Sequence, residues 1–281
     1  MIERPDWKIS RPIKDIDLSG NVHYDKVLVD YIRTLEIKNI HDYPNQFELY
    51  ESISNYYKIP LKNLTIGFGS SEIISRIITH FVTHLYIVEP TFEMVQVYCR
   101  MYSIPYTSIT IDQVFDLPES SQVYIANPSG NTGEAYDLSQ LKFDLLILDE
   151  AYADFYPIHS RLDEDNDWLI IVKTLSKSLG LAGLRVGFCK ATEEKTTLLQ
   201  STRSNFITSS YATEIIPKVI NQTSAVVKRM NEAKKYFESN YKCKPSKGNY
   251  VLFVESNNFT NKYGYKLVNG YYRMALTNID K

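Results

Sequence analysis

The sequence predicts a doubly wound α/β fold, with a mostly parallel seven-stranded sheet and a small, truncated α+β domain after it. Three observations predict this fold. Short, continuous apolar runs recur along the middle of the chain, as in strands covered on both faces. Segments with apolar residues at helical spacing lie between these runs. After about residue 190 the chain changes to longer helical stretches and two further strands.

The expected elements follow from these patterns in chain order. Strands are expected at 64–69, 84–89, 105–111, 122–127, 144–149, 169–174 and 184–188, with helices at 71–81 and 91–102 between them. Beyond them, helices are expected at 192–205 and 224–240 and strands at 249–255 and 271–277, while the polar, Gly- and Asn-rich segment 256–270 favours a loop or hairpin. This organisation predicts an N-terminal arm (1–41), a large domain (42–222) and a small C-terminal domain (223–281).

Composition excludes several classes of protein. The 281 residues are 44% hydrophobic and 23% charged, which is ordinary for a globular protein. A net charge of −2 gives no basic excess for nucleic acid. The three cysteines have no close spacing, so neither a disulfide framework nor a metal site is expected. The segment MIERPDWKIS has no apolar leader and no run is long enough to cross a membrane, so we expect a cytoplasmic protein.

Polar side chains follow the predicted strands, where open α/β sheets bind their ligands. The stretch 174-TLSKSLGLAGLR-185 places Lys177 after a buried strand. Such a lysine suits a Schiff base, and Thr174, Ser176 and Arg185 suit a phosphate beside it. A surface lysine on a loop is the alternative.

The other strand ends complete the same pattern. Asp149 ends an apolar run and could hold a pyridine nitrogen protonated, or it could cap a turn. Tyr152 could donate to a ring oxygen, or be a half-buried aromatic. Ser70 and Ser71 open a helix and could bind an anion or cap it, and Phe92 could stack on a flat ring or pack in the core. Together these residues predict a pyridoxal-phosphate pocket.

With these residues in view, the sequence resembles the fold-type I pyridoxal-phosphate enzymes. Within that group it is similar to the branch of histidinol-phosphate aminotransferase and threonine-phosphate decarboxylase. The motif 174-TLSKSLGLAGLRVGF-188 is the most specific match, and 149-DEAY-152, 90-PTF-92 and the segment 43–59 match in order and spacing. The resemblance implies a homodimer with shared active sites.

The resemblance also implies a role for each matching position. Lys177 would form the Schiff base and move the proton, Asp149 would pair with the ring nitrogen, Tyr152 would bond the 3-oxygen, and Phe92 would stack on the ring. Ser70, Ser71, Thr174, Ser176 and Arg185 would hold the phosphate, and Tyr43 would reach the partner subunit's cofactor. Arg273, Asn21 and Asn249 would bind substrate.

The chain departs from the branch in three places. The C-terminal domain is short, with 17 residues between the strand 249–255 and Arg273. The segment 21-NVHY-24 keeps only Asn21 of the usual N-E-N-P, and its His23 could serve the site or only packing. In 127-NPSGNTG-133, Gly130 occupies the position of the asparagine that bonds the 3-oxygen. Our hypothesis is that Asn131 supplies this bond; the rival is Asn127, or Tyr152 alone.

These features predict a pyridoxal-phosphate-dependent aminotransferase that acts on an amino acid or amino-alcohol phosphate. Its partners would be a small-molecule amino donor and a 2-oxo acid acceptor, with neither nucleic acid nor membrane. A decarboxylase of the threonine-phosphate type is one alternative, because the pocket sequence does not decide which Cα bond breaks. A non-catalytic dimeric module that keeps the fold is the other.

Overall fold

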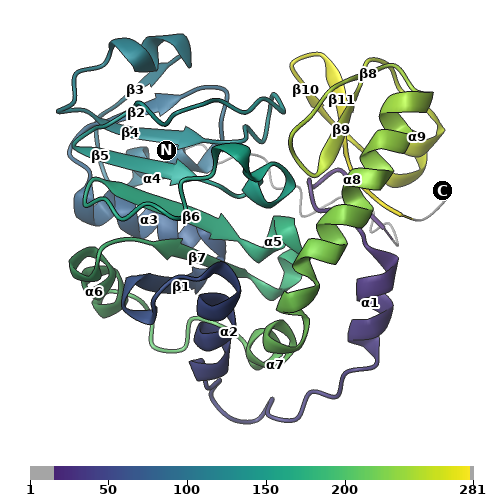
Figure 1. The fold of residues 1–281 in the computed structure, drawn as a ribbon, viewed down its shortest axis with the longest axis horizontal. Helices are drawn as coiled ribbons and strands as arrows, with labels where there is room; N and C mark the ends of the chain where they lie inside the picture. Colours follow the sequence, from purple (N-terminus) through teal and green to yellow (C-terminus); the bar gives the residue numbers. More distant parts are fainter. Residues whose placement is uncertain (1–15, 279–281) are drawn as a thin grey trace.

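The computed structural model describes residues 16–278 of the chain and shows two sheets side by side (Figure 1). The middle of the chain forms a seven-stranded sheet, and the C-terminal part forms a four-stranded sheet packed against helix α8 (Thr223–Asn240). The segment 1–10, for which no leader is predicted, lies outside the described residues.

The large sheet has the strand order β1-β7-β6-β5-β4-β2-β3. Strand β7 is antiparallel to both neighbours, and the other neighbouring pairs run parallel. This arrangement confirms the predicted seven-stranded, mostly parallel sheet. Its strands are β1 (Leu64–Phe68), β2 (Leu85–Val88), β3 (Tyr106–Ile109), β4 (Gln122–Ala126), β5 (Leu145–Asp149), β6 (Leu169–Thr174) and β7 (Val186–Lys190).

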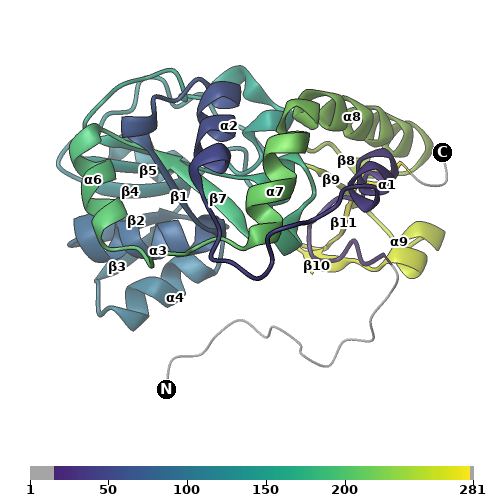
Figure 2. The same ribbon diagram turned by 90° about the horizontal axis from the view of Figure 1, so that it is seen from below.

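Helices cover the sheet because their apolar residues recur on one side. Helix α3 (Gly69–Phe81) buries four isoleucines at helical spacing against β1, β6 and β7, and α4 (Met94–Met101) lies beside it on the same side (Figure 2). The remaining helices are α1 (Lys26–Arg33), α2 (Phe47–Tyr57), α5 (Leu175–Ser178), α6 (Glu193–Ser201), α7 (Ser210–Val219) and α9 (Asn258–Tyr263).

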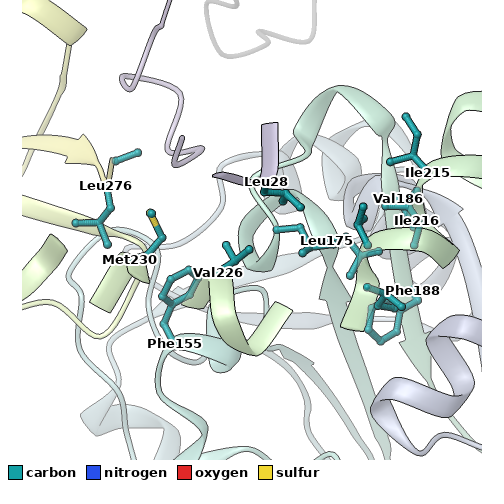
Figure 3. Close-up of a cluster of buried hydrophobic side chains, with 14 of the residues drawn as sticks. Leu28, Phe155, Leu175, Val186, Phe188, Ile215, Ile216, Val226, Met230 and Leu276 are labelled. Carbon is teal, nitrogen blue, oxygen red and sulfur yellow. The ribbon is translucent and has the colours of Figure 1, made fainter. Parts of the chain in front are cut away.

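One apolar cluster joins the large sheet to the small domain. Figure 3 shows side chains from distant parts of the sequence within it: Leu28 of α1, Leu175 of α5, Val226 and Met230 of α8, and Leu276. Residues 16–25 of the N-terminal arm also join the small domain, since Leu18 bonds Tyr263 and Ala275 through its backbone and Tyr24 bonds Leu276. The start and end of the described chain therefore pack together.

The segment 256–270 corrects one prediction. It contains helix α9 as well as strand β10 (Lys266–Val268), which forms a hairpin with β11 (Tyr271–Ala275). The helix starts because the Asn257 side chain accepts from the backbone of Phe259 and Thr260, while the Thr260 hydroxyl accepts from Asn257 N. The hairpin was expected and the helix was not. The small sheet is completed by β8 (Cys243–Lys244) and β9 (Tyr250–Phe253).

Other predicted element boundaries also differ from those in the structure. The helix expected at 91–102 begins at Met94, and the one expected at 192–205 ends at Ser201. Helices α1, α2 and α7 were not predicted as separate elements, and α7 contains Pro217. Within residues 16–278, no helix is long and apolar enough to cross a membrane.

Candidate active site

The predicted site residues gather along one edge of the large sheet, the edge formed by the carboxyl ends of its parallel strands, because the strands that precede them run in the same direction. Ser70 and Ser71 follow β1, Phe92 follows β2, and Asn131 follows β4. Asp149 ends β5 and Thr174 ends β6. The topology alone therefore brings residues more than 100 positions apart to one edge.

Lys177 is held at this edge by a short, well-anchored helix. Thr174 caps α5: its Oγ1 accepts from Ser176 N (3.2 Å) and donates to Val186 O (3.1 Å). The half-buried Lys177 points its Nζ at the backbone oxygen of Asn21, 2.7 Å away. Burial lowers the pKa of Lys177 to about 7, and the charge of Arg273 adds to this effect. Near neutral pH a large share of the lysine is therefore an uncharged amine.

Asp149 is buried on the same edge and held by two donors. Its Oδ2 accepts from the Tyr124 hydroxyl at 2.6 Å, and its Oδ1 accepts from Ala151 N at 3.0 Å. Burial raises the pKa of Asp149, while these two hydrogen bonds and Lys177 oppose the rise. A cationic ring nitrogen at this carboxylate would favour its ionised form further.

Tyr152 stands between Asp149 and the N-terminal arm. Its hydroxyl accepts from Nδ2 of Asn21 at 2.6 Å, and Lys177 Nζ lies 5.8 Å from the centre of its ring. Burial raises the pKa of Tyr152 to about 12, so its hydroxyl keeps its proton near neutral pH. Tyr152 is therefore available as a hydrogen-bond donor.

Arg185 lies over the start of α3 and forms a corner suited to a phosphate. Its guanidinium contacts the backbone oxygen of Phe68, and a Cβ atom on Gly69 would lie 2.4 Å from Nη2 of Arg185. Helix α3 begins without a side-chain cap; the N–H of Gly69 donates to Arg185 O at 2.9 Å, and the N–H groups of the next residues can face an anion. The Oγ of Ser176 is buried and has no hydrogen-bond partner among residues 16–278. These donors suit a dianionic ligand.

Arg273 faces the same edge from β11 of the small sheet. Its Nη1 donates to Gly130 O at 2.7 Å and to Oδ1 of Asn131 at 3.4 Å. Its Nε is buried and has no partner in the described part of the chain. The Nδ2 of Asn131 donates to Thr91 O at 2.7 Å. Asn131 therefore links Arg273 to the loop after β2.

The other loop asparagine is engaged elsewhere. Asn127 donates to Tyr136 O at 2.8 Å and accepts from Tyr136 N at 2.9 Å, so its side chain closes its own loop. Position 130 has no room for a side chain, because a Cβ atom there would lie 2.7 Å from Cε2 of Tyr152. The glycine thus allows the loop to pack directly on the Tyr152 ring.

Asn21 and Asn249 meet beside Lys177. Nδ2 of Asn249 lies 3.3 Å from Asn21 O and 3.5 Å from Nδ1 of His23. His23 is buried, and burial lowers its pKa to about 4, so the ring is neutral near pH 7. Asn21 has a left-handed backbone with φ 57°, and Oδ1 of Asn249 has no partner among the described residues.

The donor set fits pyridoxal phosphate. Ser176 Oγ, Asn249 Oδ1 and Arg273 Nε are buried polar atoms without partners in residues 16–278, and such atoms are costly unless a ligand or water meets them. The same end of the sheet holds the amine of Lys177, the carboxylate of Asp149 for the ring nitrogen and the phenol of Tyr152 for the ring oxygen. The anion-binding groups around Arg185 lie at this end as well.

The sequence comparison agrees with this geometry. Residues 16–251 match the family described as aminotransferase class I and II. The chain belongs to this family. The match confirms the predicted membership of the class I/II pyridoxal-phosphate aminotransferases, the aminotransferase activity and pyridoxal phosphate as the cofactor.

Several relatives of this aminotransferase found by sequence are described as histidinol-phosphate aminotransferases. Histidinol-phosphate aminotransferase from Clostridium beijerinckii is 28% identical over 257 residues, which cover 79% of this chain and 70% of the relative. The solved histidinol-phosphate aminotransferase from Sinorhizobium meliloti, in complex with pyridoxal-5'-phosphate, has a TM-score of 0.74 at 16% identity, covering 95% of this chain and 87% of that one. That from Clostridium acetobutylicum has a TM-score of 0.71 at 19% identity, covering 93% and 94%. The decarboxylase and non-catalytic alternatives are not favoured.

One predicted site residue of the aminotransferase, Tyr43, lies on the exposed surface. Tyr43 is 78% exposed and stacks on Phe206, with ring centres 4.2 Å apart. Phe92 is half-buried and packs against the core cluster under α3 and α4. Within one chain, therefore, Tyr43 is not brought to the site.

Sequence reasoning missed Tyr124. It lies within the apolar run of β4, where its spacing suggests only a core residue, yet it donates the shortest bond to Asp149. The one available signal was a polar hydroxyl inside a fully buried strand, which requires a partner.

Proposed function

We propose that this aminotransferase acts on an amino acid or amino-alcohol phosphate, as its relatives described as histidinol-phosphate aminotransferases do. The relatives found by sequence support this substrate class. The acceptor would be a 2-oxo acid, because the amino group taken from the first substrate must leave with a second.

The residues of the large domain would hold the cofactor. Ser70, Ser71, Thr174, Ser176 and Arg185 would bind its phosphate, Asp149 would pair with its ring nitrogen, and Tyr152 would bond its 3-oxygen. When bound, pyridoxal phosphate accepts the electron pair left at the substrate Cα when a proton is removed. Asp149 would support this by keeping the ring nitrogen cationic.

Lys177 would move the proton, and its environment is the observation that carries the proposal. The hydrogen-bond acceptor found for its Nζ is the uncharged carbonyl of Asn21, and the pKa of the amine is about 7. A neutral amine can take the Cα proton with its lone pair while one N–H stays on Asn21 O. The same amine can then give up this proton again, which completes the proton transfer.

Arg273 would bind the anionic group of the substrate. Arg273 is 8% exposed, and the acceptors of its guanidinium among residues 16–278, Gly130 O and Asn131 Oδ1, are neutral. A carboxylate or a phosphate would provide the missing negative charge and a partner for Nε. Asn249 and Asn21 line the same wall beside Lys177.

A cytoplasmic homodimer with shared sites is part of the proposal. Large apolar side chains are exposed on and near α2 and α7, and they include Phe47, Phe206, Tyr211 and Tyr43. A second copy could cover this surface and receive Tyr43 at its own cofactor phosphate. Mixing inactive Lys177→Ala with inactive Tyr43→Ala chains should restore about a quarter of the activity if sites are shared, and none if they are not.

One experiment tests the proposed activity. Purified protein with pyridoxal phosphate should develop a visible band that borohydride fixes to Lys177. An amino donor such as histidinol phosphate should remove the band and a 2-oxo acid should restore it. Carbon dioxide release without this cycle would contradict the proposal.

A further inference from the structure

A second buried lysine lies four residues before Lys177, at the end of strand β6. The side chain of Lys173 is 3% exposed. Its Nζ lies 3.3 Å from Oδ1 of Asp154 and 3.6 Å from Oε2 of Glu150. The Glu150 side chain is 0% exposed and that of Asp154 is 17% exposed. None of the three residues takes part in the proton transfer proposed above.

Further bonds fix this charge cluster of Lys173, Glu150 and Asp154 in place. The two carboxylate oxygens of Glu150 accept from Ser160 Oγ at 2.6 Å and from Arg161 N at 2.7 Å. Oδ2 of Asp154 accepts from the Tyr57 hydroxyl at 3.0 Å. The cluster therefore has defined geometry rather than a loose pairing of charges.

The charge cluster lies on the same two strands as the cofactor site, directly next to it in sequence. Glu150 follows Asp149 in the chain, and Lys173 precedes Thr174, the cap of the helix that carries Lys177. Strands β5 and β6 are paired here, with Asp149 opposite Val172 and Glu150 N bonded to Val172 O at 2.8 Å. Because side chains alternate along a strand, Lys173 points to the face opposite Val172, away from the buried core that contains Val172 and Tyr124.

Two adjacent buried carboxylates need a nearby cation. Without one, the negative charge of Glu150 favours protonation of Asp149, which would then lose its ionic bond to a ring nitrogen. Asp154 lines a cavity of about 520 Å³, so water in this cavity can hydrate its carboxylate. The Glu150 side chain is 0% exposed and does not line the cavity, so its carboxylate is not hydrated in this way. Lys173 is thus the compensating charge for Glu150.

We propose that Lys173 is a positioning residue that neutralises Glu150 and thereby keeps Asp149 ionised toward the cofactor. The inference rests on the proposed function, since it concerns the same cofactor. Lys173 would act on the reaction only through Glu150 and Asp149.

The chain offers a matched control. Lys190, on the neighbouring strand β7, is also buried, and its Nζ bonds the backbone oxygens of Leu162 and Glu164 and pairs with Asp165 at 2.8 Å. It lies opposite Ile171, further from the site-bearing end of β6. Lys190→Met therefore removes a buried lysine without changing the charge next to Asp149.

The experiment compares Lys173→Met, Glu150→Gln, their double variant and Lys190→Met with the wild type. Two quantities are measured: the dissociation constant of pyridoxal phosphate, and the pH midpoint at which the visible band of the bound cofactor changes. Thermal unfolding of the cofactor-free proteins reports the purely structural effect.

We expect Lys173→Met to weaken cofactor binding about tenfold and to raise the pH midpoint, because the site becomes more negative. Glu150→Gln should lower the midpoint, and the double variant should return both quantities to within about threefold and a few tenths of a pH unit of wild type. Lys190→Met should change only the unfolding temperature. This pattern would support the proposal.

Other results would overturn it. If Lys173→Met and Lys190→Met lose similar stability and both keep wild-type cofactor binding and midpoint, Lys173 is only structural. A double variant as impaired as Lys173→Met would exclude charge compensation. Should Lys173→Met fail to fold, Glu150→Gln decides: an unchanged midpoint overturns the inference. Failure of the wild type to bind pyridoxal phosphate would instead reject the proposed function.

Discussion

Lys173 and Lys177 are four residues apart, yet their surroundings shift the pKa values of the two amines in opposite directions. Burial lowers the pKa of both. For Lys173 the carboxylates of Asp154 and Glu150 more than reverse this effect, so its pKa is raised. Lys177 meets a backbone carbonyl instead, and its pKa falls to about 7.

The difference shows that partners, more than burial, decide what a buried lysine can do. A lysine between two carboxylates stays charged and holds structure. A lysine on a neutral carbonyl can lose its proton near neutral pH and act as a base. The change from strand β6 to helix α5 turns the second lysine away from the acids that hold the first.

Removing the reactive lysine tests the comparison most strongly. Lys177→Ala should abolish borohydride fixation of the cofactor and lower kcat by about 10⁴-fold, since both the covalent link and the base are lost. Steady-state kinetics with the exposed Lys62→Ala as control would check this. Activity within tenfold of wild type would assign the base to another residue.

Removing the negative charge of Asp149 should have the next largest effect on kcat. Asp149→Asn keeps the shape but loses the charge that opposes a cationic ring nitrogen, and kcat should fall about 10²- to 10³-fold. Tyr124→Phe, which removes only the 2.6 Å bond to Asp149, should cost about tenfold. Equal effects of the two variants would indicate that position, and not charge, matters at Asp149.

The pH profile tests the neutral state of Lys177 directly. Lys177 is a free amine only while substrate occupies the site, its pKa is about 7 and its base form lies above the pKa, so kcat should rise with pH through about 7. Below that value the rate should fall about tenfold per pH unit. A rate that is flat from pH 5.5 to 8 would show that a different group titrates.

Placing an acid beside Lys177 should make it resemble Lys173. Asn21→Asp introduces a carboxylate at the Tyr152 hydroxyl, on the residue whose backbone oxygen accepts from Lys177, and the lower limb of the pH profile should move up by about one unit. Asn240→Asp adds the same charge at the exposed end of α8 and serves as the control. The comparison would break if both variants shifted the profile equally.

Much of the large-domain side of the site could be predicted from sequence. Lys177, Asp149 and Arg185 lie next to strongly apolar strands, and parallel strands of one sheet end at one edge. The topology then places them together whatever the details of the loops. The motif around Lys177 added the specific chemistry.

The small-domain side could not be predicted in the same way. Helix α9 depends on the capping box of Asn257 and Thr260 within a polar segment that also suits a loop. Some contacts of the large domain could not be predicted either, because the packing of Gly130 on the Tyr152 ring and the pairing of Lys173 with Glu150 join residues that are not neighbours in sequence. A single sequence shows which residues are polar, but not which distant residues they meet.

The joining of the N-terminal arm to β11 has a consequence for biosynthesis. Asn21 contributes its carbonyl to Lys177, and its neighbours Leu18 and Tyr24 are held by the backbone of Ala275 and Leu276. Contacts between residues so far apart form late, because a long loop must close before they are made. A nascent chain that has emerged only as far as β7 would carry Lys177 and Asp149 but lack the final wall of the pocket. The pocket would thus be completed only after β11 has been synthesised and has paired with the N-terminal arm.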